Sequence, residues 1–211
     1  MSFMPISLNL KDKPVVIIGG GKTAERKAIK IVRHGAKLTV VSPQLSEKLV
    51  ELVENQSVQW IQSAYNKVYL DQAFLIIAAT NDPEVNLTVY LDRKPNQLIN
   101  IVDQPELSDF HMVSTLQRGK LTISVSTEGA SPMLAKKIVN QLSEEYGQEY
   151  EEYVEFLRES RKEILENISE KKVCHQFLNE LITDEVIYNS ERKIWFEKRM
   201  QQYMEMEEER S

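Results

Sequence analysis

Cysteine is almost absent from this chain of 211 residues, with Cys174 as the single thiol. One thiol forms no internal disulfide and supplies no cysteine-rich metal site. No stretch approaches the roughly 18 consecutive apolar residues of a membrane helix, and the first ten residues lack the layout of a signal peptide. We therefore expect a cytoplasmic protein with no membrane partner and no dedicated metal site.

Dense clusters of basic residues interleaved with aromatic ones are also lacking, which argues against a nucleic-acid partner. The net charge of −6 is unevenly distributed. Residues 143–211 hold 19 acidic and 10 basic residues, a net −9, whereas residues 1–142 hold 13 acidic and 16 basic residues, a net +3. The mildly basic body suits anionic ligands, and the acidic remainder is typical of a part with a separate role.

Glycine is scarce too, but three of the seven glycines are consecutive and directly follow the apolar run Val15–Ile18. A strand that breaks into glycines and restarts as a helix can hold a diphosphate, because the backbone turns tightly and helical N–H groups face the ligand. Gly19, Gly21 and Ala24 fit the spacing G-x-G-x-x-A of the dinucleotide-binding fingerprint. The pattern predicts a dinucleotide site.

Apolar runs alternate with helical patterns through the first half of the chain, which predicts a parallel sheet covered by helices, a Rossmann-type α/β fold. The expected strands are 15–18, 38–41, 58–61, 74–78 and 98–102. The expected helices are 22–34, 44–54 and 83–94.

The pattern changes after Asp103. Residues 112–116 and 121–126 predict a β-hairpin with a glycine in its turn, and Ser131-Pro132 begins a helix. Helical pattern then continues to the end of the chain. We expect three parts: a dinucleotide-binding domain at 1–112, a small α+β dimerisation segment at 113–146, and a helical C-terminal domain at 147–211.

The residues directly after the strands are the candidate site residues, because ligands of open parallel sheets bind at the carboxyl ends of the strands. Asp103 follows the fifth apolar run and is a candidate general base. The alternative for Asp103 is a turn or helix-cap aspartate, since Gln104-Pro105-Glu106 is turn-like. Thr80 and Asn81 follow the fourth run and are candidate cofactor contacts.

Ser42, Pro43 and Gln44 follow the second run, where many nicotinamide-binding sheets place an acid that binds the ribose hydroxyls. No acid is present there, so Ser42 and the following backbone are the candidate ribose contacts. Lys22 and Thr23 adjoin the glycines. Because Lys22 is positively charged, electrostatics alone does not decide between NAD and NADP as the cofactor. The alternative is that Lys22 is a solvated helix residue with no part in cofactor binding.

A second strand–loop–helix junction lies at Ser126–Pro132. Ser126, Thr127, Gly129 and Ser131 provide hydroxyls, a flexible turn and a helix start, which could form a second anion site for substrate carboxylates. A plain helix cap is the alternative.

Taken in this order, the segments resemble the family of bifunctional precorrin-2 dehydrogenase/sirohydrochlorin ferrochelatases, which includes the N-terminal part of siroheme synthase. The resemblance covers roughly residues 6–138. The matching blocks are Gly19–Lys27, Gly35–Val40, Ala78–Asp82, Asn100–Asp103 and Ser126–Ala135. Val113 departs from the family, which often has proline there.

The resemblance implies NAD-dependent oxidation of precorrin-2 to sirohydrochlorin by a homodimer, with Asp103 as the catalytic base. In bifunctional members the same aspartate also takes part in iron insertion, and whether this chain inserts iron or cobalt stays open. The family's NAD contacts match Lys22-Thr23 and Pro43-Gln44, and Ser126-Thr127 would lie near the substrate. A non-catalytic NAD-sensing module is the alternative function. It would explain the glycines but leave Asp103 and the loop at 126–132 without a role.

Overall fold

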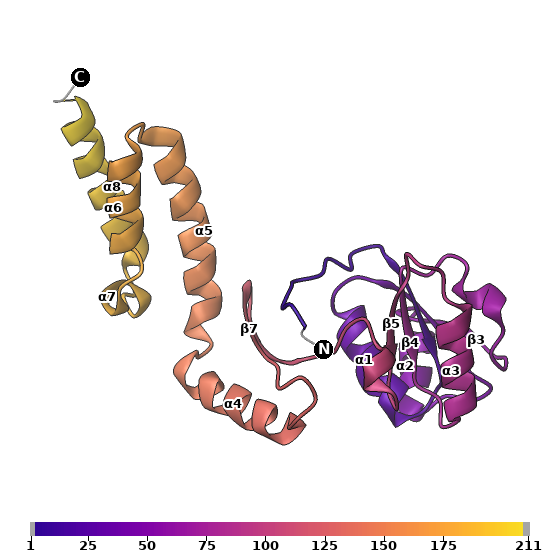
Figure 1. Ribbon diagram of the computed structural model, residues 1–211. Coiled ribbons are helices and arrows are strands. Elements are labelled where there is room, and N and C mark those ends of the chain that lie inside the picture. The colour runs from indigo at the N-terminus through magenta and orange to yellow at the C-terminus, as the bar shows by residue number, and fades with distance from the viewer. Residues whose placement is uncertain (1–2, 209–211) are drawn as a thin grey trace. The chain divides into compact units, whose positions relative to one another are not determined.

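The computed structural model describes residues 3–208, and its internal contacts divide the chain into two units, Met1–Met112 and Val113–Ser211 (Figure 1). Within residues 3–208, no helix combines the length and the apolar character needed to cross a membrane. The further division of the second unit at residue 146 stays a prediction.

The first unit is built on a five-stranded sheet in which every pairing is parallel. The strand order is β3-β2-β1-β4-β5. Their bounds are Pro14–Ile18 for β1, Lys37–Val41 for β2, Gln59–Ile61 for β3, Leu75–Ala78 for β4 and Leu98–Ile101 for β5. The chain order reverses between β1 and β4, which creates the switch point where such sheets bind ligands.

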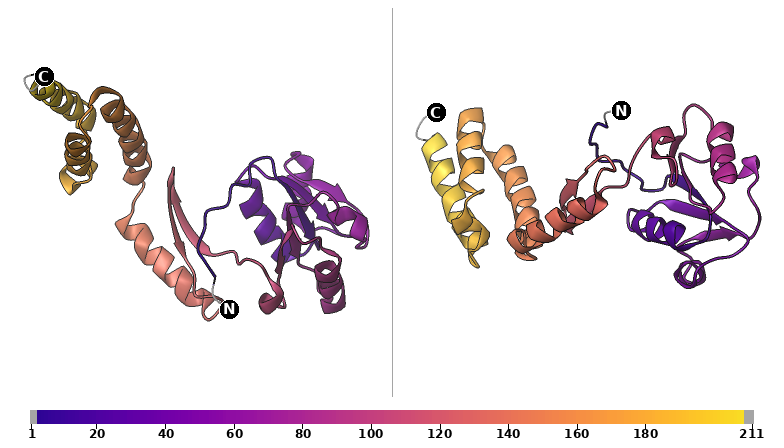
Figure 2. Two further views of the ribbon diagram at one scale, coloured as in Figure 1. Left: turned by 45° about the horizontal axis from the view of Figure 1, so that its top comes forward. Right: turned by 60° about the horizontal axis from the view of Figure 1, so that its bottom comes forward.

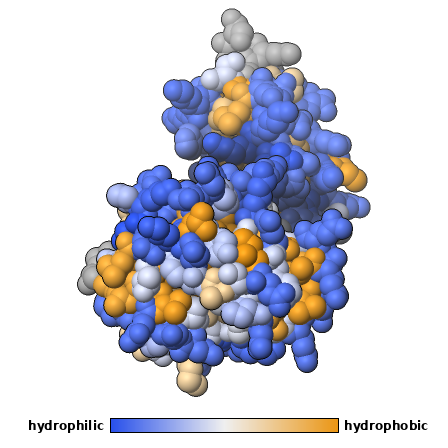
Figure 3. Space-filling view, turned by 90° about the vertical axis from the view of Figure 1, so that its right-hand side faces the viewer, coloured by the Kyte–Doolittle hydropathy of each residue, from blue (hydrophilic) through white to orange (hydrophobic). Residues whose placement is uncertain are grey.

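Helices cover both faces of this sheet, as the apolar character of both strand faces predicted (Figures 1 and 2). Alternate residues of β1 are buried against α1 (Lys22–Val32) and α2 (Glu47–Glu54) on one face. The others are buried against α3 (Pro83–Asp92) and the short η1 (Lys67–Leu70) on the other face. The α/β prediction is confirmed. The surface seen in Figure 3 shows apolar groups separated by hydrophilic ones, as is usual for globular proteins.

The predicted boundaries in this unit differ from the observed ones by at most two residues, except at the start of α2, where the difference is three. The helical pattern predicts a helix from residue 44, but α2 begins at Glu47 and Ser46 is its N-cap. The backbone N–H of Ser46 donates to the carbonyl of Gly20 at 2.8 Å, so the chain crosses the glycine turn before the helix starts. Residues 42–46 are therefore a loop at the carboxyl edge of the sheet.

The interior of the first unit contains a buried polar contact between α1 and β5. Asn100 is 5% exposed, and its Oδ1 accepts a hydrogen bond of 2.7 Å from Nζ of Lys27. The amide of Asn100 in turn donates to the carbonyl of Phe110 at 3.0 Å. Burial, assisted by the nearby cations Lys30 and Arg26, lowers the pKa of Lys27 to about 8.

The second unit begins with a hairpin of β6 (Ser114–Arg118) and β7 (Leu121–Val125). The first strand starts and ends two residues later than predicted, because a two-residue turn with Gly119 at φ 52° joins Arg118 to Leu121. Helix α4 (Pro132–Glu145) packs against both strands. A short 3-10 helix, η2 (Pro105–Leu107), precedes this unit in the chain.

Four helices complete the chain, which confirms the helical C-terminal part: α5 (Glu149–Asn167), α6 (Lys171–Glu180), α7 (Asp184–Ile187) and α8 (Arg192–Glu208). Their core is aromatic. The buried ring of Phe177 stacks on Tyr203 at 4.5 Å and on Phe196 at 5.4 Å between centroids. The hydroxyl of Tyr153 donates to the carbonyl of Leu181 at 2.8 Å, so the one buried phenol of α5 is satisfied.

We expect the half-buried ammonium of Lys27 to make the stability of the protein rise with pH above about 8. The native state holds Lys27 at a pKa of about 8, whereas an unfolded lysine has a pKa near 10.5. Between these values the unfolded state binds more protons, so its free energy rises relative to the native state as protons become scarce. The free energy of unfolding of wild type should therefore increase relative to that of Lys27→Met between pH 8 and 10.

Urea unfolding followed by circular dichroism at each pH measures this difference. The loss of the Lys27–Asn100 hydrogen bond shifts the variant by an amount that does not depend on pH, so only the slope is diagnostic. Parallel curves for the two proteins would contradict the expected titration.

Candidate active site

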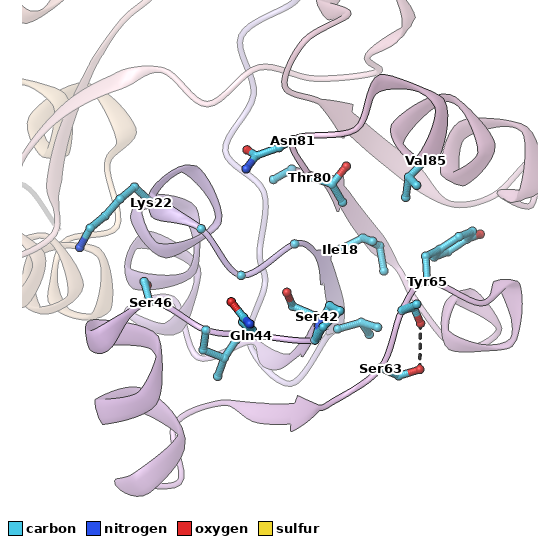
Figure 4. A pocket seen from close by; sticks show the side chains of 18 residues that line it. Ile18, Lys22, Ser42, Gln44, Ser46, Ser63, Tyr65, Thr80, Asn81 and Val85 are labelled. Atoms are coloured by element: carbon cyan, nitrogen blue, oxygen red, sulfur yellow. Dashed lines mark hydrogen bonds between the residues drawn. The ribbon is translucent and has the colours of Figure 1, made fainter.

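A pocket of about 590 Å³ opens at the carboxyl ends of β1, β2 and β4, at the switch point of the sheet (Figure 4). Four loops line it: the glycine turn after β1 and the loops that follow β2, β3 and β4. Of the candidate cofactor residues, it brings together Gly19, Gly21, Lys22, Ser42, Pro43, Gln44, Thr80 and Asn81. It does not include Thr23 and Ala24.

The three consecutive glycines are required for different reasons. Gly19 has φ 120°, and a Cβ there would lie 2.3 Å from the carbonyl oxygen of Ala79. A Cβ on Gly20 would lie 2.0 Å from the carbonyl oxygen of Gln44. A Cβ on Gly21 would meet nothing within 4 Å, so this residue borders open space. The first two glycines let backbones pack together, and the third leaves room beside the helix start.

Helix α1 begins at this open space with no side-chain cap, because Gly21 is its N-cap. The N–H groups of the first turn have no partner within a helix, and the helix dipole adds positive potential there. Ala24 is fully buried and Thr23 is half-buried, so the first turn offers backbone amides rather than these side chains. This arrangement fits the diphosphate of a dinucleotide.

Lys22 is the one cation among the described residues that line the pocket. Its ammonium lies 3.0 Å from a carboxylate oxygen of Glu25, which is buried, whereas the Lys22 side chain is 72% exposed. The charge of Lys22 is therefore already paired within the first turn of α1. This pairing weakens the case for a second phosphate at this point.

The loop after β2 is fixed by the neighbouring strand. The indole N–H of Trp60 donates to the carbonyl of Ser42 at 2.9 Å, and Ser42 is only 8% exposed. No acidic residue lies among the described residues that line the pocket. Ser42 and the following residues line the pocket at this point, and their contact with a ribose stays a prediction.

The loop after β3 contributes a wall that the sequence patterns did not reveal, with Ser63, Ala64 and Tyr65 lining the pocket (Figure 4). The Tyr65 hydroxyl donates to a carboxylate oxygen of Asp92 at 2.9 Å. Burial first, and then Asp92, raise the pKa of Tyr65. The signal available in the sequence was the position of this segment, directly after the third strand.

A buried asparagine joins the loop after β4 to Asp103. Asn86 of α3 has no exposed surface, and its Oδ1 accepts hydrogen bonds from the N–H and the hydroxyl of Thr80 at 3.1 and 2.8 Å. Its Nδ2 donates to Oδ1 of Asp103 at 3.0 Å. Asp103 itself is exposed and does not line the pocket, but this amide ties it to the pocket wall.

Asp82, which lies between Thr80 and Asn86 in the chain, accepts hydrogen bonds from the N–H groups of Glu84 and Val85. It thereby caps α3.

Asn86 was not identified as a site residue from the sequence, because the sequence pattern alone does not show which loop its side chain faces. A polar residue on the buried stripe of a helix, three positions before the buried Val89, is the signal that could have revealed it.

The candidate substrate residues lie in the second unit, between β7 and α4. Each of the three hydroxyls accepts a local backbone hydrogen bond: Ser126 from Glu128 at 3.1 Å, Thr127 from Ser131 at 3.1 Å, and Ser131 from Leu134 at 3.3 Å. Gly129 has φ 86°. These bonds form a turn and a helix cap, so a role in substrate binding stays a prediction.

Across residues 3–208, no three His, Cys, Asp or Glu side chains gather closely enough to hold a metal ion.

Two family models match the chain. A model described as putative NAD(P)-binding matches residues 6–114, and one described as sirohaem biosynthesis protein, central, matches residues 118–144. Together they cover the sheet with its pocket, and the segment that holds most of the hairpin and α4.

Named relatives agree with these models. The precorrin-2 dehydrogenase of Priestia megaterium is 33% identical over 180 residues, which are 85% of this chain and 89% of the relative. Siroheme synthase 3 of Aeromonas hydrophila is 38% identical over 143 residues, 67% of this chain but 31% of the relative. The chain thus spans about a third of the siroheme synthases that it matches.

A solved structure titled SirC, precorrin-2 dehydrogenase, matches with a TM-score of 0.81 and 30% sequence identity, and the match covers 95% of this chain and 100% of that one. The length of the match exceeds that of any single domain of the chain. The chain belongs to the family of the precorrin-2 dehydrogenases and of the corresponding part of the siroheme synthases.

Proposed function

We propose that the protein oxidises precorrin-2 to sirohydrochlorin with NAD, in the formation of siroheme in the cytoplasm. The observation that carries this proposal is the chain of hydrogen bonds from Thr80 through Asn86 to Asp103. It links a dinucleotide pocket to an exposed carboxylate at the same edge of the sheet. A non-catalytic NAD-sensing module would require the pocket, but it would give this carboxylate no role.

The reaction removes one hydride and one proton from the tetrapyrrole. When bound, NAD supplies the hydride acceptor and becomes NADH. The first turn of α1 binds the diphosphate through backbone amides, and Thr80 and Asn81 form the wall beside it. Asp103 accepts the proton and, because it is exposed, returns that proton to water. The departing hydride and proton balance the two hydrogens that the substrate loses.

NAD fits the ribose end of the pocket better than NADP does. A 2′-phosphate is recognised by basic side chains, and the only cation among the described lining residues is Lys22, which is paired with Glu25. Ser42, Pro43 and Gln44 offer neutral groups to ribose hydroxyls. We therefore assign them to NAD binding, together with the backbone amides of Lys22 and Thr23 in the first turn of α1.

The carboxylates of the tetrapyrrole are the proposed ligands of the loop at 126–131. Ser126, Thr127, Gly129 and Ser131 lie directly before α4, at the positive end of its helix dipole, which suits anions. Insertion of iron or cobalt into sirohydrochlorin would need a group that accepts the pyrrole protons, and Asp103 is the candidate for that step too.

A second copy of the chain is the proposed partner of the hairpin. A two-stranded sheet is marginal by itself, and in β6, β7 and α4 only Leu116 and Ala135 are buried. Met133 and Leu134 are 85% and 48% exposed at the start of α4. A homodimer through this segment would cover apolar surface that the isolated unit leaves open to water.

The glycine turn gives a matched pair of variants for NAD binding. Gly20→Ala should lower the melting temperature and weaken NAD binding, because its Cβ would displace the backbone of Gln44. Gly21→Ala should fold like wild type, since its Cβ meets nothing and its φ of −84° suits alanine. Its methyl group would still occupy the space beside the diphosphate, and we expect NAD to bind roughly tenfold more weakly, about 1.4 kcal/mol.

Calorimetric titration with NAD and thermal unfolding measure the two effects separately. If both variants bound NAD with wild-type affinity, the glycine turn would not be part of the cofactor site.

Loss of the carboxylate at residue 103 should abolish most turnover but leave NAD binding intact. Asp103→Asn keeps the shape of the side chain and removes the proton acceptor, so kcat should fall by about 100-fold or more. The assay follows the absorbance of sirohydrochlorin formed from precorrin-2 and NAD, and a second assay adds Fe²⁺ or Co²⁺ to sirohydrochlorin. Asp71→Asn is the matched control, because Asp71 is an exposed carboxylate paired with Lys94, before β4 rather than after a strand.

Wild-type rates in Asp103→Asn would exclude this residue as the base. Absence of turnover by wild type would contradict the proposed function itself.

The oligomeric state tests the proposed partner. Light scattering after size exclusion should give twice the 24.4 kDa mass of one chain. Replacing Met133 and Leu134 by glutamate should shift the protein toward the monomer, because two charges would have to be buried at the contact. A monomeric wild type at micromolar concentration would contradict the homodimer.

A further inference from the structure

Asn86 is a fully buried polar residue of α3 that lies between the cofactor pocket and Asp103. Burying an amide away from water is costly unless its hydrogen-bonding groups are satisfied. Both the oxygen and the nitrogen of the Asn86 side-chain amide form hydrogen bonds. The oxygen accepts from the N–H and hydroxyl of Thr80, and the nitrogen donates to the carbonyl of Thr80 at 3.3 Å and to Asp103 at 3.0 Å.

The orientation of this amide is fixed by chemistry. The backbone N–H of Thr80 can only donate, so the atom of Asn86 that faces it must be the oxygen. The nitrogen of Asn86 therefore faces Asp103, and it can only donate. The Asp103 oxygen that receives this hydrogen bond, Oδ1, must act as an acceptor.

Asn86 is also the sole hydrogen-bond partner of the Asp103 carboxylate in the part of the chain that the structure describes. The hydrogen bond occupies one oxygen, Oδ1. The second oxygen is left for a proton that arrives from outside. At the other end of the amide, Thr80 and the adjacent Asn81 line the pocket.

We infer that Asn86 is the positioning residue of the reaction: it binds one oxygen of the Asp103 carboxyl group, leaves the other without a protein partner among the described residues, and so holds Asp103 at a fixed place relative to the cofactor pocket. The inference rests on the proposed function, because it assigns Asp103 the role of base. Asn86 itself contacts neither substrate nor cofactor. Its effect reaches the reaction through its hydrogen bond to Asp103 and the orientation that this bond imposes.

Two substitutions of Asn86 in the full chain separate charge from shape. Asn86→Asp keeps the shape but places a second carboxylate at about 3 Å from Asp103. Two carboxyl groups this close share a proton rather than both ionise. The acid limb of the pH profile of kcat should therefore move to higher pH by at least one unit. Asn86→Leu removes the donor without adding charge, so its limb should move in the same direction by less.

The matched control is Gln97, another buried amide in the same unit. Gln97 directly precedes the first residue of β5 and is 3% exposed. Its side-chain amide donates to the carbonyl of Ala73 at 2.8 Å. Gln97→Glu makes the same chemical change at the end of β5 away from Asp103. It should lower the melting temperature as Asn86→Asp does, but it should leave the pH profile of kcat and the KM for NAD unchanged.

A readout without turnover keeps this inference distinct from the proposed function. In protein labelled with ¹³C at aspartate carboxyl groups, the Asp103 signal is assigned by its loss in Asp103→Asn, and its titration is followed by NMR without ligands. It should titrate at least one pH unit higher in Asn86→Asp than in wild type or Gln97→Glu.

An unmoved Asp103 titration in Asn86→Asp would overturn the role of Asn86, whatever the activity. A moved titration in a protein that does not turn over precorrin-2 would support the contact and contradict the proposed reaction. A moved titration with an unmoved pH profile of kcat would overturn the positioning role, because the rate would then not depend on Asp103.

Discussion

The parallel pairing of β1 with both β2 and β4 is the constraint on which the rest of the first unit depends. It sets Ile18 opposite Val41 and Ala78, so three loops leave the sheet at the same level. Backbone bonds continue past the strands: Gly19 N–H donates to the carbonyl of Val41 at 2.9 Å, and Ala79 N–H to that of Ile18 at 2.8 Å. The loops therefore begin at fixed points, and a pocket built from their backbones can be precise without many side chains.

Close backbone contacts then hold these loops to one another. Gly19 packs on the carbonyl of Ala79, and Gly20 packs on that of Gln44, at distances that no Cβ would permit. The glycine run thus has two tasks, to leave room for a ligand and to join the neighbouring loops. A chain with only seven glycines places three of them here because both tasks fall on adjacent residues.

Features set by the local sequence pattern could be predicted, and features set by contacts between distant residues could not. Apolar runs predicted every strand of the sheet, and the position of Asp103 after the fifth run placed it at the carboxyl edge. The loop at 44–46 escaped prediction, because its residues fit a helical pattern and only the contact of Ser46 with Gly20 stops the helix. Asn86 escaped for a similar reason: its partners lie 6 and 17 residues away, and the packing of α3 on the sheet alone brings them together.

The position of Asp103 also depends on how the edge strand β5 is covered. Only β4 pairs with β5, and two outward N–H groups of β5 are instead satisfied by side chains that follow it, Ile99 by Asp109 at 3.0 Å and Ile101 by Ser108 at 2.9 Å. Asn100 ties the same segment to α1 through Lys27. Apolar side chains at these positions would leave the backbone N–H groups of Ile99 and Ile101 without these partners. The polar contacts hold the end of β5 from the side that lacks a strand, so that Asn86 meets Asp103 at a fixed point.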